Sequence, residues 1–459
     1  MTDEAPDTYD VLVLGGGSGG YACALRSAQL GLRVALIERD KLGGTCLHRG
    51  CIPTKALLHA AEVADTARDG ARFGVNSSVE SIDMAAVLKY QQGVVARLHK
   101  GLQGLVSAAS IDYLDGFGEV TSPTTVRVGD RTVTGRRLVL ATGSRARSLP
   151  GLAIGGRVLT SDQALGLTEV PSSVIILGGG VIGVEFASVF RSFGASVTIV
   201  EALPRLVPAE EESISKALER AFRKRGIVSR TGVRFAGVTQ DDSSVTVTLE
   251  DGSTLTADLL LVAVGREPVS DGMGFEAAGI VTDRGFVPTD ERLGTNVPGV
   301  YAVGDLVPGL QLAHRGFSHG VFVAEDIAGM NPDPVLDRRI PKVTYCDPEI
   351  ASVGLTEAAA RAEYGEVRSY EYNLGGNGKS QILGTTGFVT VVRAVDGPVV
   401  GIHMIGARMG EQIGEAQLVV GWEAMPEDVA PLVHAHPTQN EALGEAHLAL
   451  AGKPLHAHA

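Results

Sequence analysis

Two cysteines, Cys46 and Cys51, are separated by four residues and directly precede an apolar-periodic stretch. Four cysteines in a 459-residue chain do not form a disulfide scaffold, so a close pair indicates catalysis or metal binding. Five residues of ideal helix rise about 7.5 Å, whereas the Cα atoms of a disulfide lie roughly 4.4–6.8 Å apart. Gly50 and Pro53 would supply the irregular turn that such a bridge needs. A position at the start of a helix also lowers the pKa of a thiol and makes it a better nucleophile.

The same spacing leaves two other interpretations open: a pair of unrelated buried thiols, or half of a metal site. Zinc would need two more Cys or His ligands nearby. The remaining cysteines, Cys23 and Cys346, stand singly in an expected packing helix and an expected strand. We therefore expect Cys23 and Cys346 to be structural and no metal to be bound.

A candidate base lies near the C-terminus, where residues 434–441 read HAHPTQNE. Histidine, with an ordinary pKa of about 6.5, can take and return a thiol proton near neutrality. A carboxylate on the other ring nitrogen would fix its tautomer and orientation. Histidines near a terminus are often merely exposed, which is our interpretation of His447, His456 and His458.

An internal repeat defines the elements that must position these groups. Residues 11–20 recur as residues 174–183, and the offset of 163 holds without gaps as far as Glu38 and Glu201. Each copy reads as a buried strand, a glycine turn, an apolar-periodic helix and a β-branched strand that ends in Glu. The pattern predicts two βαβ units of the parallel, doubly wound kind.

Each copy carries a G-x-G-x-x-G turn. The first Gly permits the bend, the second lets the backbone approach a pyrophosphate, and the third lets the helix pack on the strand. The helix N-terminus then faces the phosphates with free N–H groups. A single match could be only a glycine-rich turn, but two matches in the same context favour two dinucleotide sites, at Gly15, Gly17 and Gly20 and at Gly178, Gly180 and Gly183.

An acid follows the last glycine of each turn by 18 residues: Glu38 in the first copy and Glu201 in the second. At the end of the second strand a carboxylate can accept both hydroxyls of an adenosine ribose. Either Glu alone could be a solvated strand end. A 2′-phosphate would be repelled there, so Glu201 favours NAD over NADP.

Composition excludes several functions. The formal charge is −13 and no Lys/Arg cluster is long enough to follow a nucleic-acid backbone. No uninterrupted apolar run approaches the roughly 20 residues of a membrane span, and residues 1–10 do not resemble a signal peptide. The composition, with 44% hydrophobic and 20% charged residues, indicates a globular protein. The length of 459 residues indicates several domains. From the N-terminus and the apolar runs we expect a cytoplasmic protein.

The fold class that follows is α/β, with two Rossmann-like domains and a C-terminal α+β domain. We place the first dinucleotide domain at residues 1–148 and the second at 149–268. A central segment covers 269–340, and the C-terminal domain covers 341–459.

Residues 43–55 read GGTCLHRGCIPTK, which resembles the active-site signature of the class I pyridine nucleotide-disulfide oxidoreductases. Further similar segments, which extend over nearly the whole chain, are 141–144 (ATGS), 263–266 (AVGR), 300–305 (VYAVGD) and 312–314 (LAH). The resemblance implies that 1–148 binds FAD, 149–268 binds NAD, 269–340 completes the FAD site and 341–459 forms the interface of an obligate homodimer.

The resemblance also implies residue roles. Cys46 and Cys51 would be the redox-active pair, His436 the base for the cysteines of the other subunit, and Glu441 its orienter. Asp305 would bind the FAD ribitol, Ala313 the flavin ring through its backbone, and Lys55 would lie near flavin N5 with Glu185 as its partner. The other cofactor contacts it implies are Gly118, Thr142, Gly143, Ser144, Gly265 and Arg266. His48-Arg49, where many members carry Asn-Val, leaves the local electrostatics open.

Within the family the residues are most similar to the dihydrolipoamide dehydrogenases. NADP-linked disulfide reductases carry Arg in place of Glu201 and Tyr in place of Val181, and other branches end in an extra Cys pair that this chain lacks. The implied activity passes electrons from dihydrolipoyl groups of 2-oxoacid dehydrogenase complexes, or of the glycine cleavage carrier, to NAD. Two alternatives remain: another low-molecular-weight disulfide reductase, or a non-catalytic nucleotide-binding regulatory protein.

Overall fold

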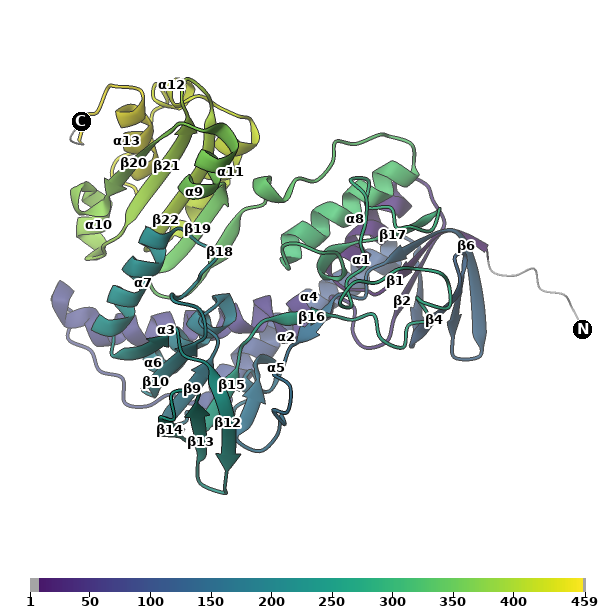
Figure 1. The fold of residues 1–459 in the computed structure, drawn as a ribbon, viewed down its shortest axis with the longest axis horizontal. Coiled ribbons are helices and arrows are strands. Elements are labelled where there is room, and N and C mark those ends of the chain that lie inside the picture. Colours follow the sequence, from purple (N-terminus) through teal and green to yellow (C-terminus); the bar gives the residue numbers. More distant parts are fainter. Residues whose placement is uncertain (1–7, 457–459) are drawn as a thin grey trace, which may run out of the picture. The chain divides into compact units, whose positions relative to one another are not determined.

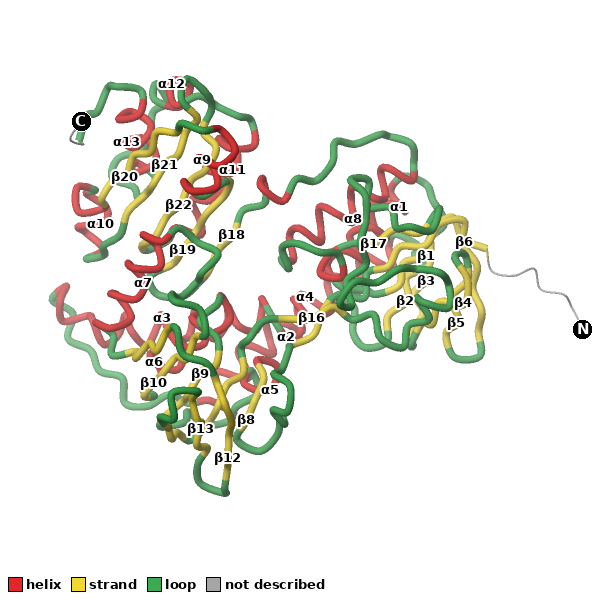
Figure 2. The backbone as a smooth tube through the Cα atoms, viewed as in Figure 1, coloured by secondary structure: helices red, strands yellow, loops and turns green. Residues whose placement is uncertain are grey.

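The computed structural model describes residues 8–456. The chain forms two compact units, which are described separately. The first contains residues up to Ala56, Ala85–Arg147 and Arg266–Asp337; the second contains Leu57–Met84, Ser148–Gly265 and the residues from Arg338 onward. Figure 1 shows the course of the ribbon, and Figure 2 separates helices, strands and loops.

The first unit is built on a seven-stranded sheet in the order β3-β2-β1-β6-β5-β4, with β17 also paired to β6. The strands β3, β2, β1, β6 and β17 run parallel, while β4 and β5 form an antiparallel extension. These strands are β1 (Thr8–Leu14), β2 (Val34–Glu38), β3 (Asp112–Asp115), β4 (Gly118–Ser122), β5 (Thr125–Val128), β6 (Arg131–Leu140) and β17 (Val300–Ala302). A two-stranded ribbon joins β7 (Ser144–Ala146) to β16 (Arg266–Pro268).

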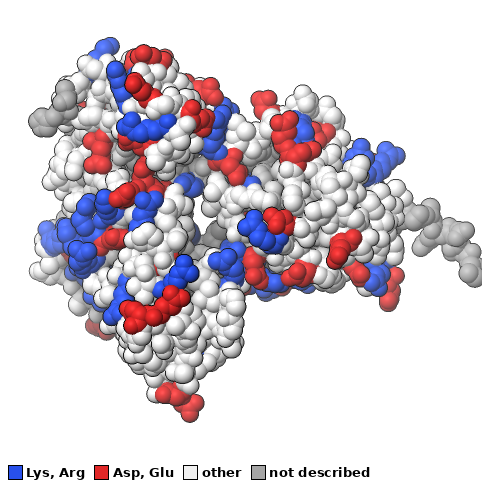
Figure 3. Space-filling view, in the orientation of Figure 1, with Lys and Arg blue, Asp and Glu red and all other residues white. Residues whose placement is uncertain are grey.

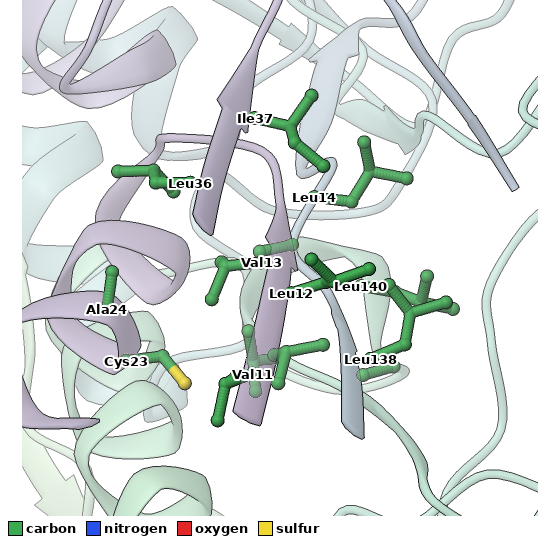
Figure 4. Close-up of a cluster of buried hydrophobic side chains, with 14 of the residues drawn as sticks. Val11, Leu12, Val13, Leu14, Cys23, Ala24, Leu36, Ile37, Leu138 and Leu140 are labelled. Atoms are coloured by element: carbon green, nitrogen blue, oxygen red, sulfur yellow. The ribbon is translucent and has the colours of Figure 1, made fainter. Parts of the chain in front are cut away.

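The helices of the first unit are α1 (Ser18–Gln29), α2 (Gly44–Arg49), the start of α3 (Cys51–Asp69), α4 (Met84–Ala108) and α8 (Ala313–Ile327), with a short 3-10 turn η2 (Gly304–Leu306). Helices α1 and α8 pack closely, because a Cβ on Gly320 would lie 2.2 Å from the carbonyl oxygen of Gly19. Figure 4 shows Cys23 and Ala24 of α1 beside the apolar side chains of β1. Cys23 is fully buried in this core, as expected of a structural thiol.

The second unit contains a five-stranded parallel sheet in the order β11-β10-β9-β15-β8 and an antiparallel sheet β12-β13-β14. The strands are β8 (Val158–Thr160), β9 (Ser173–Leu177), β10 (Ser196–Glu201), β11 (Ile227–Thr231), β12 (Phe235–Gln240), β13 (Val245–Leu249), β14 (Thr254–Ala257) and β15 (Leu259–Val262). The helices here are α5 (Ser161–Ala164), α6 (Val181–Phe193) and α7 (Glu212–Lys224), together with the remainder of α3 and the 3-10 turn η1 (Gly70–Phe73).

The repeat found in the sequence recurs in the backbone. Helices α1 and α6 begin 163 positions apart, and so do the last residues of β2 and β10. The first glycine of each turn has nearly the same positive φ, 109° at Gly15 and 106° at Gly178. The register agrees too, since Val11 pairs with Val34 and Val174 with Val197. One βαβ design is therefore used twice.

The C-terminal part of the second unit is an antiparallel sheet in the order β18-β19-β22-β21-β20. Its elements are β18 (Lys342–Thr344), β19 (Glu349–Gly354), α9 (Glu357–Tyr364), β20 (Val367–Asn373), η4 (Leu374–Gly376), α10 (Gly378–Leu383), β21 (Phe388–Ala394), β22 (Val399–Gly406), α11 (Met409–Gly421), α12 (Pro426–Val429) and α13 (Glu441–Leu450), preceded by the 3-10 turn η3 (Asp337–Arg339). Strands β21 and β22 are buried throughout.

The predicted fold class, α/β with two Rossmann-like domains and a C-terminal α+β domain, is confirmed. Across residues 8–456, none of the helices combines the length and the apolar character that crossing a bilayer requires. Acidic and basic side chains are intermixed over most of the face drawn in Figure 3, apart from a group of basic side chains near α7.

Candidate active site

The cysteine pair lies at a break between two helices. Helix α2 ends at Arg49 and α3 begins at Cys51, so that Gly50 alone separates them, with φ −142° and ψ −111°. The hydroxyl and the amide of Thr54 both donate to the carbonyl oxygen of Gly50, at 2.6 and 3.1 Å. The irregular turn that the sequence predicts at Gly50 is present.

Neither cysteine of the pair is in a disulfide, and both are partly accessible to solvent. A hydrogen bond between the two thiols, followed by burial, raises the pKa of Cys46 well above its ordinary value. The positive charge of Lys55 opposes this increase in the pKa of Cys46, and the negative charge of Asp305 adds to it. The contact between the two thiols therefore favours the retention of a proton by the reduced pair.

Three of the expected cofactor residues from distant segments form one polar cluster. The hydroxyl of Ser144, on β7, donates to the carboxylate of Asp305 at 2.5 Å. Arg266, on β16, donates to the Ser144 hydroxyl at 2.7 Å and to its carbonyl oxygen at 2.8 Å. The Arg266 guanidinium is also 3.9 Å from the Asp305 carboxylate. Thr45, next to Cys46, donates to the Ser144 carbonyl at 3.3 Å, so this cluster borders the cysteine segment.

The first glycine turn fits a bound dinucleotide. A Cβ on Gly15 would lie 2.3 Å from the carbonyl oxygen of Ala141, and one on Gly20 would lie 1.8 Å from that of Gly15. These two glycines are required by packing. A Cβ on Gly17 would meet nothing closer than 4.0 Å. The open side is therefore the one from which a pyrophosphate would approach, and no side chain caps α1.

The second turn repeats this arrangement. A Cβ on Gly178 would lie 2.3 Å from the carbonyl oxygen of Ala263, and one on Gly183 would lie 1.9 Å from that of Gly178. A Cβ on Gly180 would meet nothing within 4 Å, and no side chain caps α6. The chain thus fits two dinucleotides, one at each turn.

The two predicted ribose acceptors have equivalent surroundings. One carboxylate oxygen of Glu38 accepts from the amide of Gly16 at 2.7 Å, and one of Glu201 accepts from that of Gly179 at 2.6 Å. The second oxygen of each accepts from the backbone N–H two residues further on, at 2.9 and 2.7 Å. These bonds fix both carboxylates at the ends of β2 and β10, beside the glycine turns.

The remaining expected cofactor residues of the first unit lie in different settings. Thr142 and Gly143 are tied to Val269, whose amide donates to the Gly143 carbonyl at 2.9 Å and whose carbonyl accepts from the Thr142 hydroxyl. Ala313 is the first residue of α8. Gly118 faces the core instead, because its Cβ would lie 2.4 Å from the side chain of Leu14. At Gly118 the structure gives a reason for packing and none for cofactor binding.

Two further expected cofactor residues of the second unit are Gly265 and Glu185. Gly265, after β15, has φ 108°, a backbone conformation that favours glycine. Glu185, on α6, is 2% exposed and accepts from the amide of Tyr345 at 2.9 Å. Its expected pairing with Lys55 stays a prediction.

The predicted base and its orienter meet. His436 Nδ1 is 2.8 Å from Glu441 Oε1, and the other oxygen of Glu441 accepts from the amide of Thr438 at 2.7 Å. Burial alone would raise the pKa of Glu441, but the hydrogen bonds from Thr438 and His436 outweigh it and hold the pKa below its ordinary value. The His436 side chain is 77% exposed, so its free ring nitrogen is accessible to another molecule.

Glu415, which the sequence did not single out, holds both ends of the same loop. One of its oxygens is 2.8 Å from His434 Nε2, and the other accepts from the side-chain amide of Asn440. The hydrogen bond to Glu415 is the largest cause that raises the pKa of His434 above its ordinary value. Glu415 lies on α11, 19 residues before His434, and no local spacing rule would have connected them.

One expectation about the C-terminal histidines is wrong. His447 is fully buried, and its Nδ1 is 2.7 Å from the carbonyl oxygen of Leu443. It occupies the apolar face of α13. Its position on this face buries it although it lies near the C-terminus. His456 is exposed as expected, although it contacts Glu445 at 2.8 Å. His458 lies outside the described residues.

His48 and Arg49, which depart from the family signature, make defined contacts. His48 Nε2 is 2.9 Å from the carbonyl oxygen of Leu42, and its ring meets that of His99 edge-on at 4.9 Å. Arg49 forms an ion pair with Asp40.

Cys346 is buried like Cys23. Within residues 8–456, no group of three or more His, Cys, Asp or Glu side chains could hold a metal ion.

Comparison with known families gives two matches. Residues 9–320 match the family described as pyridine nucleotide-disulphide oxidoreductase. Residues 340–447 match the dimerisation domain of the same family, which supports a homodimer.

Curated relatives cover nearly the whole chain. A dihydrolipoyl dehydrogenase of Bacillus subtilis (strain 168) is 41% identical over 98% of this chain and 99% of its own length. One of Chlorobaculum parvum is 40% identical over 97% of this chain and 98% of its own length. A leghemoglobin reductase of Vigna unguiculata is 37% identical over 98% and 89%, respectively.

Solved structures agree. LpdA from Mycobacterium tuberculosis has a TM-score of 0.90 at 25% identity, covering 97% of this chain and 99% of LpdA. The HOCl-induced flavoprotein disulfide reductase RclA from Escherichia coli, in a Cu(II) complex, has a TM-score of 0.87 at 27% identity, covering 97% of this chain and 100% of RclA.

Proposed function

Because this chain belongs to the pyridine nucleotide-disulphide oxidoreductase family, we propose that it is a dihydrolipoyl dehydrogenase that oxidises dihydrolipoyl groups and reduces NAD. It is an FAD-dependent oxidoreductase linked to NAD. The observation that carries the proposal is the resemblance, at 41% identity over 98% of the chain, to a relative of that name. The Cys46 and Cys51 pair and the joined His436 and Glu441 supply the required chemistry.

The first step is a thiol-disulfide exchange in which electrons and protons balance. In the oxidised enzyme Cys46 and Cys51 form a disulfide. His436 takes the proton from one substrate thiol, and the resulting thiolate attacks the sulfur of Cys46. The bond between Cys46 and Cys51 breaks, and Cys51 leaves as a thiolate.

The second substrate thiol then displaces Cys46 from the mixed disulfide. The substrate leaves as a cyclic disulfide, oxidised by two electrons. Its second proton passes to the departing Cys46 sulfur, so the enzyme is left with a Cys46 thiol, a Cys51 thiolate and the first proton on His436. FAD, when bound, carries the two electrons from the dithiol to NAD.

The residues of this chain hold the two cofactors. Gly17 and Gly180 leave space for the pyrophosphates, and Glu38 and Glu201 would accept the ribose hydroxyls. Asp305 would bind the FAD ribitol. The resemblance to the family implies that Lys55 would serve the flavin, with Glu185 as its partner. Residues 1–148, 149–268, 269–340 and 341–459 act as the FAD domain, the NAD domain, the segment that completes the FAD site and the interface domain.

The base acts between subunits. His436 is exposed and belongs to the family's dimerisation domain, so we assign it to the cysteines of the partner protomer. Glu441 orients the imidazole through its short contact to Nδ1. The other macromolecular partner is a lipoyl-bearing acyltransferase or carrier protein. We place the enzyme in the cytoplasm, where a reducing environment keeps Cys23 and Cys346 as thiols.

Steady-state turnover tests the proposal. The purified homodimer is assayed with dihydrolipoamide and NAD, and in parallel with NADP and with low-molecular-weight disulfides plus NADH. We expect the highest kcat/KM for dihydrolipoamide and NAD. A higher kcat/KM for another disulfide would assign the chain to a different reductase of the family, and absence of bound flavin would reject an enzymatic role.

A further inference from the structure

The segment from Gly304 to Leu310 carries Asp305 and follows β17 directly. It begins with Gly304 at φ 69° and turns through η2. The carboxylate of Asp305 accepts from the Ser144 hydroxyl at 2.5 Å. The position of that carboxylate therefore depends on what holds the segment itself.

Arg315, in the first turn of α8 and only 4% exposed, holds the C-terminal end of the segment. Its guanidinium donates to the carbonyl oxygen of Pro308 at 2.7 Å and to that of Leu310 at 3.1 Å. The remaining N–H, on Nε, donates to Asp337 Oδ1 at 2.6 Å. The planar, multidentate donor set of Arg is required for three partners at once. The segment is also close-packed here, because a Cβ on Gly309 would lie 2.6 Å from the Arg315 guanidinium.

His319, one helical turn after Arg315 and 2% exposed, holds the N-terminal end of the segment. The amide of Gly304 donates to His319 Nδ1 at 3.3 Å. An amide N–H can only donate, so this nitrogen must be unprotonated to accept it. Burial first, and then the charge of Arg315, lower the pKa of His319 to about 4, while Asp337 acts in the opposite direction. At neutral pH the imidazole is therefore uncharged and able to accept.

We propose that Arg315 and His319 are positioning residues for FAD, and that His319 makes FAD retention sensitive to acid. They hold residues 304–310 from two sides so that the Asp305 carboxylate stays where it binds the cofactor. The inference rests on the proposed function, since it takes Asp305 to be a contact of FAD.

The direction of the acid effect follows from the two states of the segment. When the segment opens, His319 regains an ordinary pKa of about 6.5, whereas in the closed segment its pKa is about 4. Protons therefore bind the open state better. FAD retention is expected to be greatest above about pH 6.5 and to fall progressively as the pH approaches 4. Arg315 and Asp337 are the charged groups that act on His319 among the described residues.

The test follows flavin release from the purified holoenzyme at pH 7.5 and pH 5, by the recovery of free-FAD fluorescence, with no turnover assay. His319→Leu removes the acceptor and is expected to release FAD about 10-fold faster at both pH values, because the buried Gly304 amide loses its partner. His319→Asn places an amide oxygen near the position of Nδ1 and does not titrate. It is expected to keep FAD at pH 7.5 and to show no acceleration at pH 5.

Ser318→Ala is the matched control, because its hydroxyl bonds only to its own helix, at the His314 carbonyl. It is expected to follow the wild-type rates at both pH values. If His319→Asn shows the wild-type acceleration at pH 5, acid release has another origin and the pH part is wrong. If His319→Leu and Arg315→Lys both retain FAD like wild type, the positioning role is wrong.

Two further readouts keep the outcomes separate. Circular dichroism at pH 7.5 shows whether His319→Leu is folded. If His319→Leu is not folded, the rates of FAD release from His319→Asn at pH 7.5 and pH 5 still test the pH effect. A wild-type protein that binds no FAD at all would overturn the proposed function. A wild-type protein that binds FAD, with variants indistinguishable from it, would overturn this inference alone.

Discussion

Paired alanine substitutions in the second glycine turn separate packing from ligand binding. Gly180 has φ −79° and ψ −173°, which alanine adopts freely, and its Cβ would meet nothing within 4 Å. Gly180→Ala should therefore change stability by less than about 1 kcal/mol, the usual difference between residues at a helix N-cap. The added methyl group points into the space assigned to the NAD pyrophosphate. We expect the KM for NAD to rise at least about 10-fold, equivalent to ~1.4 kcal/mol.

Gly183→Ala should do the opposite. Its Cβ would lie 1.9 Å from the carbonyl oxygen of Gly178, far inside the 3.0 Å limit that real Cβ contacts respect. The obstacle is backbone, so α6 must move away from β9. Overpacking of this kind costs about 3 kcal/mol at its upper range, which corresponds to a fall in Tm of about 6 °C or more.

The assay combines thermal unfolding with NAD dependence at saturating dihydrolipoamide. Gly180→Ala with an unchanged KM for NAD would show that the open side of this turn is not where the cofactor lies. Gly183→Ala with an unchanged Tm would contradict the packing argument. Gly17→Ala and Gly20→Ala provide the same contrast in the first turn, with FAD retention in place of the KM for NAD.

The further predictions concern cofactor specificity, the base and the loop that carries it. Wild type should prefer NAD over NADP by about 100-fold in kcat/KM, or about 2.7 kcal/mol, because the Glu201 carboxylate repels a 2′-phosphate; equal values would refute this role. His436→Gln should lose about 10²–10⁴ in dihydrolipoamide turnover while NADH oxidation by artificial acceptors continues. Mixed dimers of His436→Gln with Cys46→Ser should regain activity if the base acts between subunits, and no recovery despite proven subunit exchange would place both groups on one chain. Glu415→Ala should lower kcat for dihydrolipoamide about 10-fold by loosening the His436 loop, with Glu415→Gln less affected and Glu411→Gln, on the exposed side of α11, unchanged. The pKa of His434 is raised, so its pair with Glu415 should stabilise the fold fully below the ordinary histidine pKa. This stabilisation should be lost as the pH rises through the raised pKa. A difference in the free energy of unfolding between wild type and Glu415→Ala that does not change with pH would contradict this prediction.

Much of the fold could be predicted because its signals are local. The offset of 163 residues fixes two βαβ units through periodicity and glycine position. The break at Gly50 followed from the geometric conflict between a straight helix and a disulfide. The family resemblance implied the pairing of His436 with Glu441, which lie only five positions apart.

The rest depends on contacts between segments that no spacing rule connects. Glu415, on α11, reaches the loop residue His434, and Ser144 reaches Asp305 across 161 residues. His447 is buried because of the face of α13 on which it lies, which its nearness to the C-terminus does not reveal. The core-facing position of Gly118 could not be predicted either. The sequence does not distinguish a glycine required by packing from a glycine that lies against a cofactor.

Anaerobic reduction of the Cys46→Ser holoenzyme tests most directly whether electrons enter through the cysteine pair. Flavin absorbance near 450 nm is followed after addition of dihydrolipoamide or of NADH, beside wild type. Dihydrolipoamide should bleach the flavin of wild type but leave that of Cys46→Ser oxidised, because the sulfur that the substrate attacks is missing. NADH should bleach both. Bleaching of the Cys46→Ser flavin by dihydrolipoamide at the wild-type rate would contradict the central claim that substrate electrons pass through Cys46.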